Sequence, residues 1–138
     1  MRYTKTHEWV EPEGTGTVTV GISNRAQQTF GEIVFVELPE EGEEFEQDEP
    51  LGSIESIDGA VMNIHSPVTG EVIEVNAALE NSPDLINRSP EGDGWFVKMH
   101  IEVPQELNAL MIPDEYEDYE EDIIEEDFEF EDEEEEYL

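Results

Sequence analysis

The sequence feature that most constrains the fold is the dipeptide Asp58-Gly59. It separates two stretches with apolar residues at alternate positions, 54–57 and 60–66. A type I′ turn needs a positive φ at both central residues, and Asp and Gly tolerate that conformation. The dipeptide therefore predicts a β-hairpin with a two-residue turn. A second turn signal at 66–70, Ser-Pro followed by Thr-Gly, ends the hairpin. We expect the rest of the chain to be a β-scaffold that presents it.

Length and residue types limit the classes of protein to consider. With 138 residues, the chain has the size of one ordinary domain with a modest core. It has no cysteine, which excludes disulfides, thiolate zinc sites and cysteine nucleophiles. No apolar run is long enough to cross a membrane, and residues 1–10 lack the apolar core of a secretion signal. We therefore expect a cytoplasmic protein.

Acidic residues dominate the charge. The chain has 39 Asp and Glu against 5 Lys and Arg, a formal net charge of −34. Phosphate backbones and anionic membranes repel such a chain, so we expect neither nucleic-acid nor membrane partners. Basic protein surfaces are the partners that the charge favours. Adaptation to high salt would also explain the acidity, and the sequence leaves that open.

The first third of the chain predicts two strands, a short helix and a third strand. Residues 7–11 and 17–22 alternate in the manner of strands. Ser23 is a predicted N-cap for a helix at 24–30 that ends at Gly31 in the left-handed α conformation. Residues 32–38 form the most strand-like run, and we expect its middle to be buried on both faces.

The remaining elements are predicted from turn residues and alternation. Residues 40–50 are an acidic connector, and further strands are expected at 71–77 and 95–101, with helical segments that begin at Pro83, Pro104 and Pro113. Residues 113–138 contain 17 acids and no base. Because like charges repel and few apolar residues offset them, we expect a folded domain at 1–119 and a disordered acidic tail at 120–138.

These segments, in unbroken order from 1 to about 120, resemble the H protein of the glycine cleavage system, a family of lipoyl carriers. The matching runs are YTKTHEWV (3–10), TVGISNRAQQTFGEIVFVELPEEG (19–42), ESI (55–57), SPVTGEVIEVNAAL (66–79), SPDLINRSP (82–90), GWFVK (94–98) and PQELNALMIPDEYE (104–117). The resemblance implies a mainly β fold: a biotinyl/lipoyl-type barrel-sandwich hybrid of two small antiparallel sheets with short appended helices.

The resemblance also implies a lysine at the hairpin, in an ESVKA or ESIKA context, whose amine carries lipoate. The lipoyl arm takes the methylamine group of glycine from a pyridoxal-phosphate subunit and delivers it to a folate-dependent one. This sequence departs from that pattern. It reads Glu55, Ser56, Ile57, Asp58, Gly59 and Ala60, so that Asp58-Gly59 replace the single lysine, and its only lysines are Lys5 and Lys98. A carboxylate cannot form the lipoyl amide, so we expect no bound cofactor.

Three functional hypotheses follow. The first is a non-lipoylated binding or regulatory paralogue, with glycine cleavage subunits or a lipoate-handling enzyme as partners. The second is an interaction or solubility protein that acts through its acidic tail, and the third is a carrier with another mode of attachment. No enzymatic site is expected, because His7, His65 and His100 lie in separate predicted strands. No run has calcium-loop spacing, so no metal site is predicted.

Overall fold

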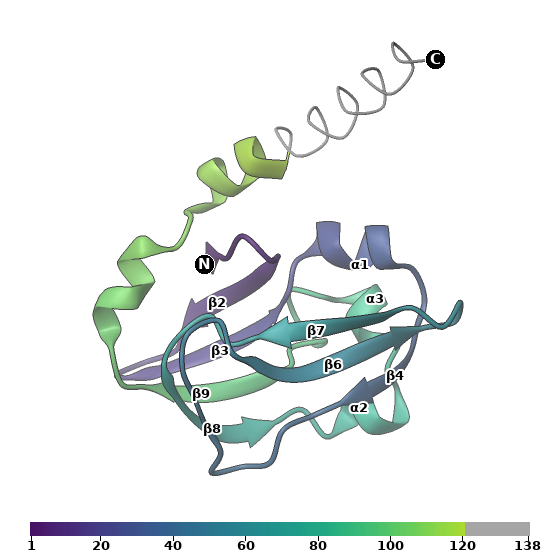
Figure 1. The fold of residues 1–138 in the computed structure, drawn as a ribbon, viewed down its shortest axis with the longest axis horizontal. Coiled ribbons are helices and arrows are strands. Elements are labelled where there is room, and N and C mark those ends of the chain that lie inside the picture. The colour runs from purple at the N-terminus through teal and green to yellow at the C-terminus, as the bar shows by residue number, and fades with distance from the viewer. Residues whose placement is uncertain (121–138) are drawn as a thin grey trace, which may run out of the picture.

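Two antiparallel sheets pack across one hydrophobic core, and short helices lie at their ends (Figure 1). The structure is a computed structural model that describes residues 1–120. The predicted tail at 120–138 lies outside the described residues, except for residue 120. Within the described part, the strands are antiparallel throughout, as expected for a mainly β sandwich.

The larger sheet has six strands in the order β1-β2-β3-β9-β8-β5, and the smaller sheet has three in the order β4-β6-β7. The strands of the larger sheet are β1 (Arg2–Tyr3), β2 (Glu8–Pro12), β3 (Thr17–Ile22), β5 (Glu44–Phe45), β8 (Gly70–Val75) and β9 (Val97–Ile101). Those of the smaller sheet are β4 (Ile33–Glu37), β6 (Pro50–Ser56) and β7 (Val61–His65).

The helical elements are short. They are α1 (Asn24–Phe30), α2 (Ala78–Asn81), α3 (Leu85–Arg88), the 3-10 helix η1 (Pro104–Ala109) and a final helical segment at 113–120. The predicted helix at 24–30 is confirmed, and the Ser23 hydroxyl accepts a hydrogen bond from the Ala26 amide, as expected of an N-cap. Gly31 ends the helix at φ 96° and ψ −162°, so its φ is positive but its conformation is not the predicted left-handed α.

The core lies between the two sheets and is built from alternate residues of their strands. Val20 and Val97 come from the larger sheet, Ile54 and Ile64 come from the smaller one, and none of these side chains has any exposed surface. Each such side chain stabilises the fold by about 1.5–3 kcal/mol relative to exposure. Because the inner faces are committed to this core, the outer face of the smaller sheet is left to the solvent.

The predicted fold class is confirmed, with one correction to its geometry. The protein is mainly β, with two antiparallel sheets and short appended helices. The sheets do not close into a barrel, because β1 and β5 remain edges of the larger sheet and β4 and β7 remain edges of the smaller one. The larger sheet, with six strands, is also wider than the small sheet that was expected.

The prediction that β4 is buried on both faces at its middle is wrong. Ile33 and Val36 are buried, but Val34 and Phe35 between them are exposed. A bulge explains the pattern, because Ile33 pairs with Ser56 and Phe35 with the adjacent Glu55, which leaves Val34 as an extra residue. Two consecutive apolar side chains therefore face the solvent.

Several smaller differences concern short elements. The predicted acidic connector at 40–50 contains the two-residue strand β5, α2 was not predicted, and the segment from Pro104 is a 3-10 helix. The segment expected to begin at Pro83 forms α3 only from Leu85. Each of these elements is shorter than seven residues, which is too short for periodicity to identify.

Candidate functional site

The tip of the β6–β7 hairpin is a three-residue loop at 57–59. The Ser56 amide donates to the Ala60 carbonyl at 2.8 Å, which makes these two residues the last pair of the ladder, and the Gly59 amide donates to the Ser56 carbonyl at 2.9 Å. Gly59 has a φ of 89°, whereas Asp58 is not among the residues with positive φ. This is a type I turn followed by a glycine bulge. The predicted two-residue type I′ turn is therefore wrong.

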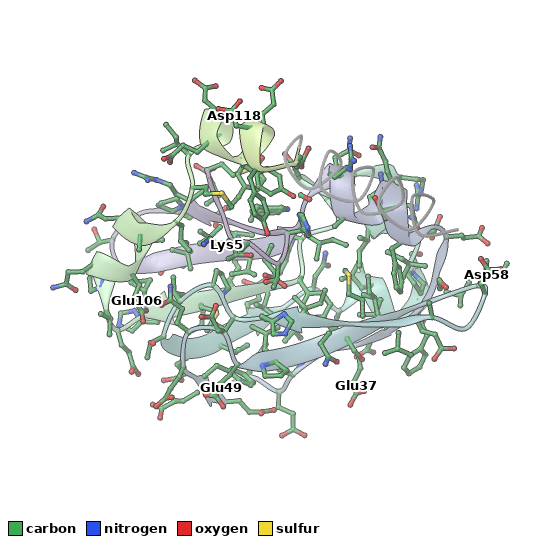
Figure 2. All side chains as sticks on the ribbon, turned by 45° about the horizontal axis from the view of Figure 1, so that its top comes forward. Lys5, Glu37, Glu49, Asp58, Glu106 and Asp118 are labelled. Atoms are coloured by element: carbon green, nitrogen blue, oxygen red, sulfur yellow. The ribbon has the colours of Figure 1, made fainter. Side chains whose placement is uncertain are left out.

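Backbone contacts hold the tip in place while its side chains remain exposed. The Ile57 amide donates to the Glu32 carbonyl at 2.9 Å, which ties the loop to the segment before β4. The buried Ser56 hydroxyl accepts from the Ala60 amide at 3.2 Å. Asp58 is exposed and projects at one end of the molecule (Figure 2). Within residues 1–120, its carboxylate makes no ion pair or hydrogen bond.

Beside the tip, apolar side chains gather on the outer face of the smaller sheet. Phe35, Glu55 and Val61 stand in register across β4, β6 and β7. Phe35 is 56% exposed, Val61 63%, the bulged Val34 46% and the loop residue Ile57 63%. We call Val34, Phe35, Ile57 and Val61 the hairpin patch. Glu55 is half-buried between Phe35 and Val61.

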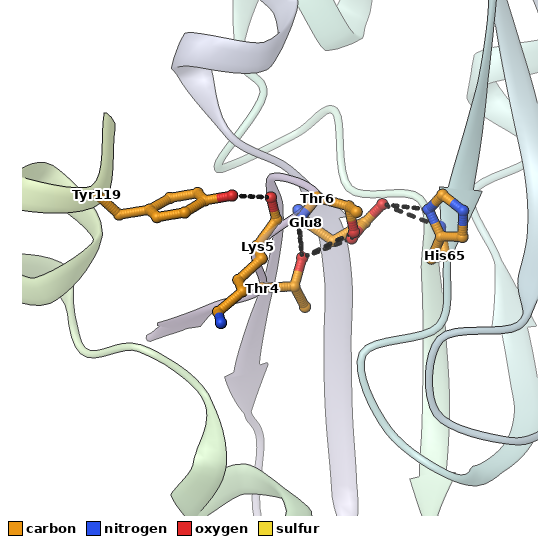
Figure 3. A network of polar contacts seen from close by, with 6 residues as sticks. All are labelled: Thr4, Lys5, Thr6, Glu8, His65 and Tyr119. Atoms are coloured by element: carbon orange, nitrogen blue, oxygen red, sulfur yellow. Dashed lines mark hydrogen bonds and ion pairs between the residues drawn. The ribbon is translucent and has the colours of Figure 1, made fainter. Parts of the chain in front are cut away.

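A second polar site surrounds a buried carboxylate in the larger sheet. Glu8 is only 1% exposed, and its two oxygens have four hydrogen-bonding partner atoms (Figure 3). One oxygen accepts from the hydroxyls of Thr4, at 2.6 Å, and Thr6. The other accepts from the amide of His65, at 3.0 Å, and lies 3.3 Å from its ring Nδ1. Because its partners come from both segments, the carboxylate joins the β1–β2 turn to the end of β7.

An aromatic cluster attaches the C-terminal helical segment to the same turn. The ring of Tyr116 stacks on Tyr3 with centroids 4.2 Å apart, and its hydroxyl lies 2.6 Å from His7 Nδ1 and 2.7 Å from the Ser23 hydroxyl. Burial raises the pKa of the Tyr116 hydroxyl, and burial also lowers the pKa of His7. The Tyr119 hydroxyl donates to the Lys5 carbonyl at 2.8 Å (Figure 3). Residues 113–120 are thus fixed to the N-terminal turn.

Neither site has the form of a reaction centre or a metal site. In residues 1–120, no group of three or more His, Asp or Glu side chains could hold a metal ion. His65 has Glu8 as its partner, His7 has Tyr116, and His100 lies in β9. The prediction that His7 lies in a strand is wrong. It lies in the turn before β2, at a φ of 72°. None of the helices in the described part is long and apolar enough to cross a membrane.

Sequence and structure comparisons identify the family. A sequence model described as "Glycine cleavage H-protein" matches residues 1–123. The chain belongs to the glycine cleavage H-protein family. The H protein of Psychromonas ingrahamii is 47% identical over 116 residues, 84% of this chain and 92% of the relative. That of Chromohalobacter salexigens is 45% identical over 111 residues, 80% of this chain and 84% of the relative. The crystal structure of the Mycobacterium marinum H protein has a TM-score of 0.74 and 34% identity, and covers 83% of this chain and 91% of its own.

Membership of the H-protein family confirms the resemblance found in the sequence. H proteins are lipoyl carriers and not catalysts, which agrees with the prediction of a carrier-type protein without its own catalytic site. The predicted site residues at 55–60 lie together at the end of the β6–β7 hairpin, beside β4. The structure separates Glu55, on the face of the sheet, from Asp58, at the tip.

The Glu8 site of this H-family chain was not predicted. Glu8 lies in a predicted strand, and an acid in a strand with a wet face ordinarily points to solvent. Its partner His65 is 57 residues away in the sequence, so no local pattern connects them. The only sequence signal was the pair of threonines before the strand, Thr4 and Thr6, whose hydroxyls can reach an acid two or four residues later.

Proposed function

We propose that this H-family protein binds partner proteins of glycine cleavage, or a lipoate-handling enzyme, without carrying a lipoyl group itself. The observation that carries the proposal is the composition of the hairpin loop, where Ile57, Asp58 and Gly59 offer no amine. The family carries lipoate, and its attachment requires an amide between a lipoyl carboxyl and a primary amine. The residues at this tip do not fit that group.

The two lysines of the chain lie elsewhere. Lys98 is in β9, where its ammonium pairs with Glu13 at 3.0 Å and lies 5.3 Å from the centre of the Trp95 ring. Lys5 is in the β1–β2 turn and is exposed. Figure 2 shows Lys5 far from Asp58, nearer the middle of the molecule. Neither lysine can replace an amine at the hairpin tip.

The competing function is a carrier with its arm at another position. Lys5 is the residue that this alternative requires, because it is the exposed lysine and sits on a turn fixed by Glu8 and Tyr119. The two functions therefore differ in a chemical property that can be measured: the presence of a lipoyl amide, and the residue that bears it.

The experiment is intact-mass measurement and peptide mapping of the protein after incubation with lipoate ligase, ATP and lipoate. The expected result is no added lipoyl mass on the wild type. Asp58→Lys, which keeps the three-residue loop, and Asp58→Lys combined with deletion of Gly59, which shortens it to two residues, are expected to be modified at position 58. Lys5→Arg is the matched control.

A lipoyl group on the wild-type protein that disappears in Lys5→Arg would contradict the proposal and establish the carrier alternative. If neither position-58 variant is modified while another H protein is, the hairpin tip is not the attachment site of this scaffold. In that event the missing amine would no longer support the proposal.

The acidic C-terminal residues supply a further candidate function, binding of basic proteins through charge alone. Residues 113–138 contain 17 acids and no base, which favours binding to a basic surface. Removal of residues 121–138 tests it, because the truncation keeps Tyr116 and Tyr119, which attach the last helical segment to the body. Unchanged affinity for a basic partner after truncation would assign binding to the domain and not to the tail.

A further inference from the structure

The hairpin patch is an apolar surface assembled from three segments. The β4 bulge turns Val34 and Phe35 outward together, the loop adds Ile57, and the first residue of β7 adds Val61. Single exposed apolar residues are ordinary, but adjacent ones on a flat sheet face mark an interaction surface. The other exposed large apolar side chains in residues 1–120, Ile73, Val103 and Ile112, lie in separate elements.

Three acidic residues lie within or beside the hairpin patch. Glu32 is tied to Ile57 through its carbonyl, Glu55 lies between Phe35 and Val61, and Asp58 is at the tip. The sequence from 26 to 87 contains neither Lys nor Arg. The charged side chains on the strands and loop that carry the patch are therefore all acidic.

A hollow continues the same face toward the base of the hairpin. The next row of outward residues is Glu37, Ser53 and Asn63, again in register across β4, β6 and β7. These residues line a depression of about 320 Å³ together with Leu38 and Phe45. An apolar area beside a shallow polar hollow has the form of a protein-binding surface with a rim.

We propose that the hairpin patch is the docking surface of this protein for a partner protein that presents an apolar side chain flanked by Lys and Arg. The inference rests on the proposed binding function and adds the chemistry of the partner. Charge complementarity selects this occupant. A second copy of the chain, with a net charge of −34, would place carboxylates against carboxylates, and the acidic residues 113–138 of the same chain would do the same.

The test is isothermal titration of the protein against four purified probes from the same organism, each measured separately: the three other glycine cleavage subunits and lipoate ligase. The double variant Phe35→Thr/Val61→Thr removes the apolar contact and keeps β-branched residues in the strands. We expect its dissociation constant to rise by about tenfold or more for at least one probe. The matched control is Ile73→Thr on β8, where the side chain is 43% exposed, and its affinity should stay within about twofold of the wild type.

A second pair of variants tests the charge. Glu37→Gln/Asp58→Asn should make the fall of affinity with rising NaCl shallower, because two carboxylates that face the basic partner are neutralised. Glu74→Gln/Glu102→Gln removes the same charge from exposed positions of the larger sheet, in β8 and directly after β9, and should leave the slope closer to that of the wild type.

The docking proposal is overturned if Phe35→Thr/Val61→Thr binds every probe as tightly as the wild type does, or if no probe binds the wild type. It is also overturned if sedimentation shows a wild-type dimer that the double variant abolishes, since a second copy would then be the occupant. The proposed function fails separately: a lipoyl mass on the wild type with patch-dependent binding refutes that function and leaves the docking surface in place.

Discussion

Two carboxylates of this protein, Glu8 and Asp58, lie in opposite settings. Glu8 is buried in the larger sheet. It accepts from two hydroxyls of the β1–β2 turn and from the amide of His65 at the end of β7, whose ring Nδ1 lies 3.3 Å away. Asp58 is exposed on a loop whose geometry depends on backbone hydrogen bonds and on Gly59. The first side chain is required by the tertiary structure around it, and the second is required by nothing in residues 1–120.

The difference indicates where this H-family fold can change its chemistry. A position whose side chain has no structural task can lose a reactive group without cost to folding. A buried charge cannot be removed in this way, because its donors would remain without partners. The lysine-free tip is therefore compatible with an intact scaffold.

The largest effect is expected for Glu8→Ala. Two hydroxyls, an amide and a ring nitrogen would lose their acceptor, which should lower the free energy of unfolding by about 3 kcal/mol. The measurement is urea unfolding followed by tryptophan fluorescence, for which the buried Trp9 next to Glu8 is a suitable probe. Asp58→Ala is the control and should change stability by less than about 0.5 kcal/mol. Equal losses for the two variants would eliminate the contrast between the sites.

The next effect concerns the aromatic cluster at the same turn. Tyr116→Phe keeps the stacking on Tyr3 but removes the hydroxyl shared by His7 and Ser23, and should cost about 1.5 kcal/mol. Tyr119→Phe loses a single hydrogen bond, to the Lys5 carbonyl, which is exposed. It should therefore lower stability by less. The same unfolding assay compares them, and a larger loss for Tyr119→Phe would show that the cluster is not the main attachment of the last helical segment.

A smaller effect is expected at the tip itself. Gly59→Ala would place a Cβ at a φ of 89°, which should cost about 1 kcal/mol. Asp58→Asn should leave stability unchanged within about 0.3 kcal/mol, since an Asn suits the same turn position. Amide resonances of Ser56 and Ala60 would report whether the loop keeps its pairing. If Asp58→Asn lowered the free energy of unfolding as much as Gly59→Ala does, the carboxylate would have a structural role.

The smallest effect is a dependence on pH through His7. Burial lowers the pKa of its ring below the ordinary 6.5, while Glu120 and Glu8 oppose that shift. The unfolded chain therefore binds more protons than the folded chain between the lowered pKa and 6.5, and stability should fall as pH falls through this window. His7→Gln should reduce the slope of unfolding free energy against pH below 6.5. An unchanged slope would refute the assignment to His7.

The alternation and cap signals of the sequence predicted most of the strands and α1. Thr17–Ile22 and Asn24–Phe30 have the predicted bounds, because a strand with one buried face and a helix with an N-cap are specified locally. The exposure of both Val34 and Phe35 was not predictable, since a bulge depends on the partner strand β6. The Glu8 site was not predicted for the same reason, because His65 comes from a strand distant in the sequence.

At the hairpin, the sequence alone predicted a turn at Asp58-Gly59 and a tip without an amine. It also predicted a positive φ at both residues, of which only Gly59 has one. The length of the loop depends on the Ser56–Ala60 pair, and the apolar surface beside it depends on the register of β4, β6 and β7. These features differ from the turn in the range of the interactions that specify them. Turn chemistry acts between neighbours in the chain, whereas register and burial depend on strands that meet only when the sheet forms.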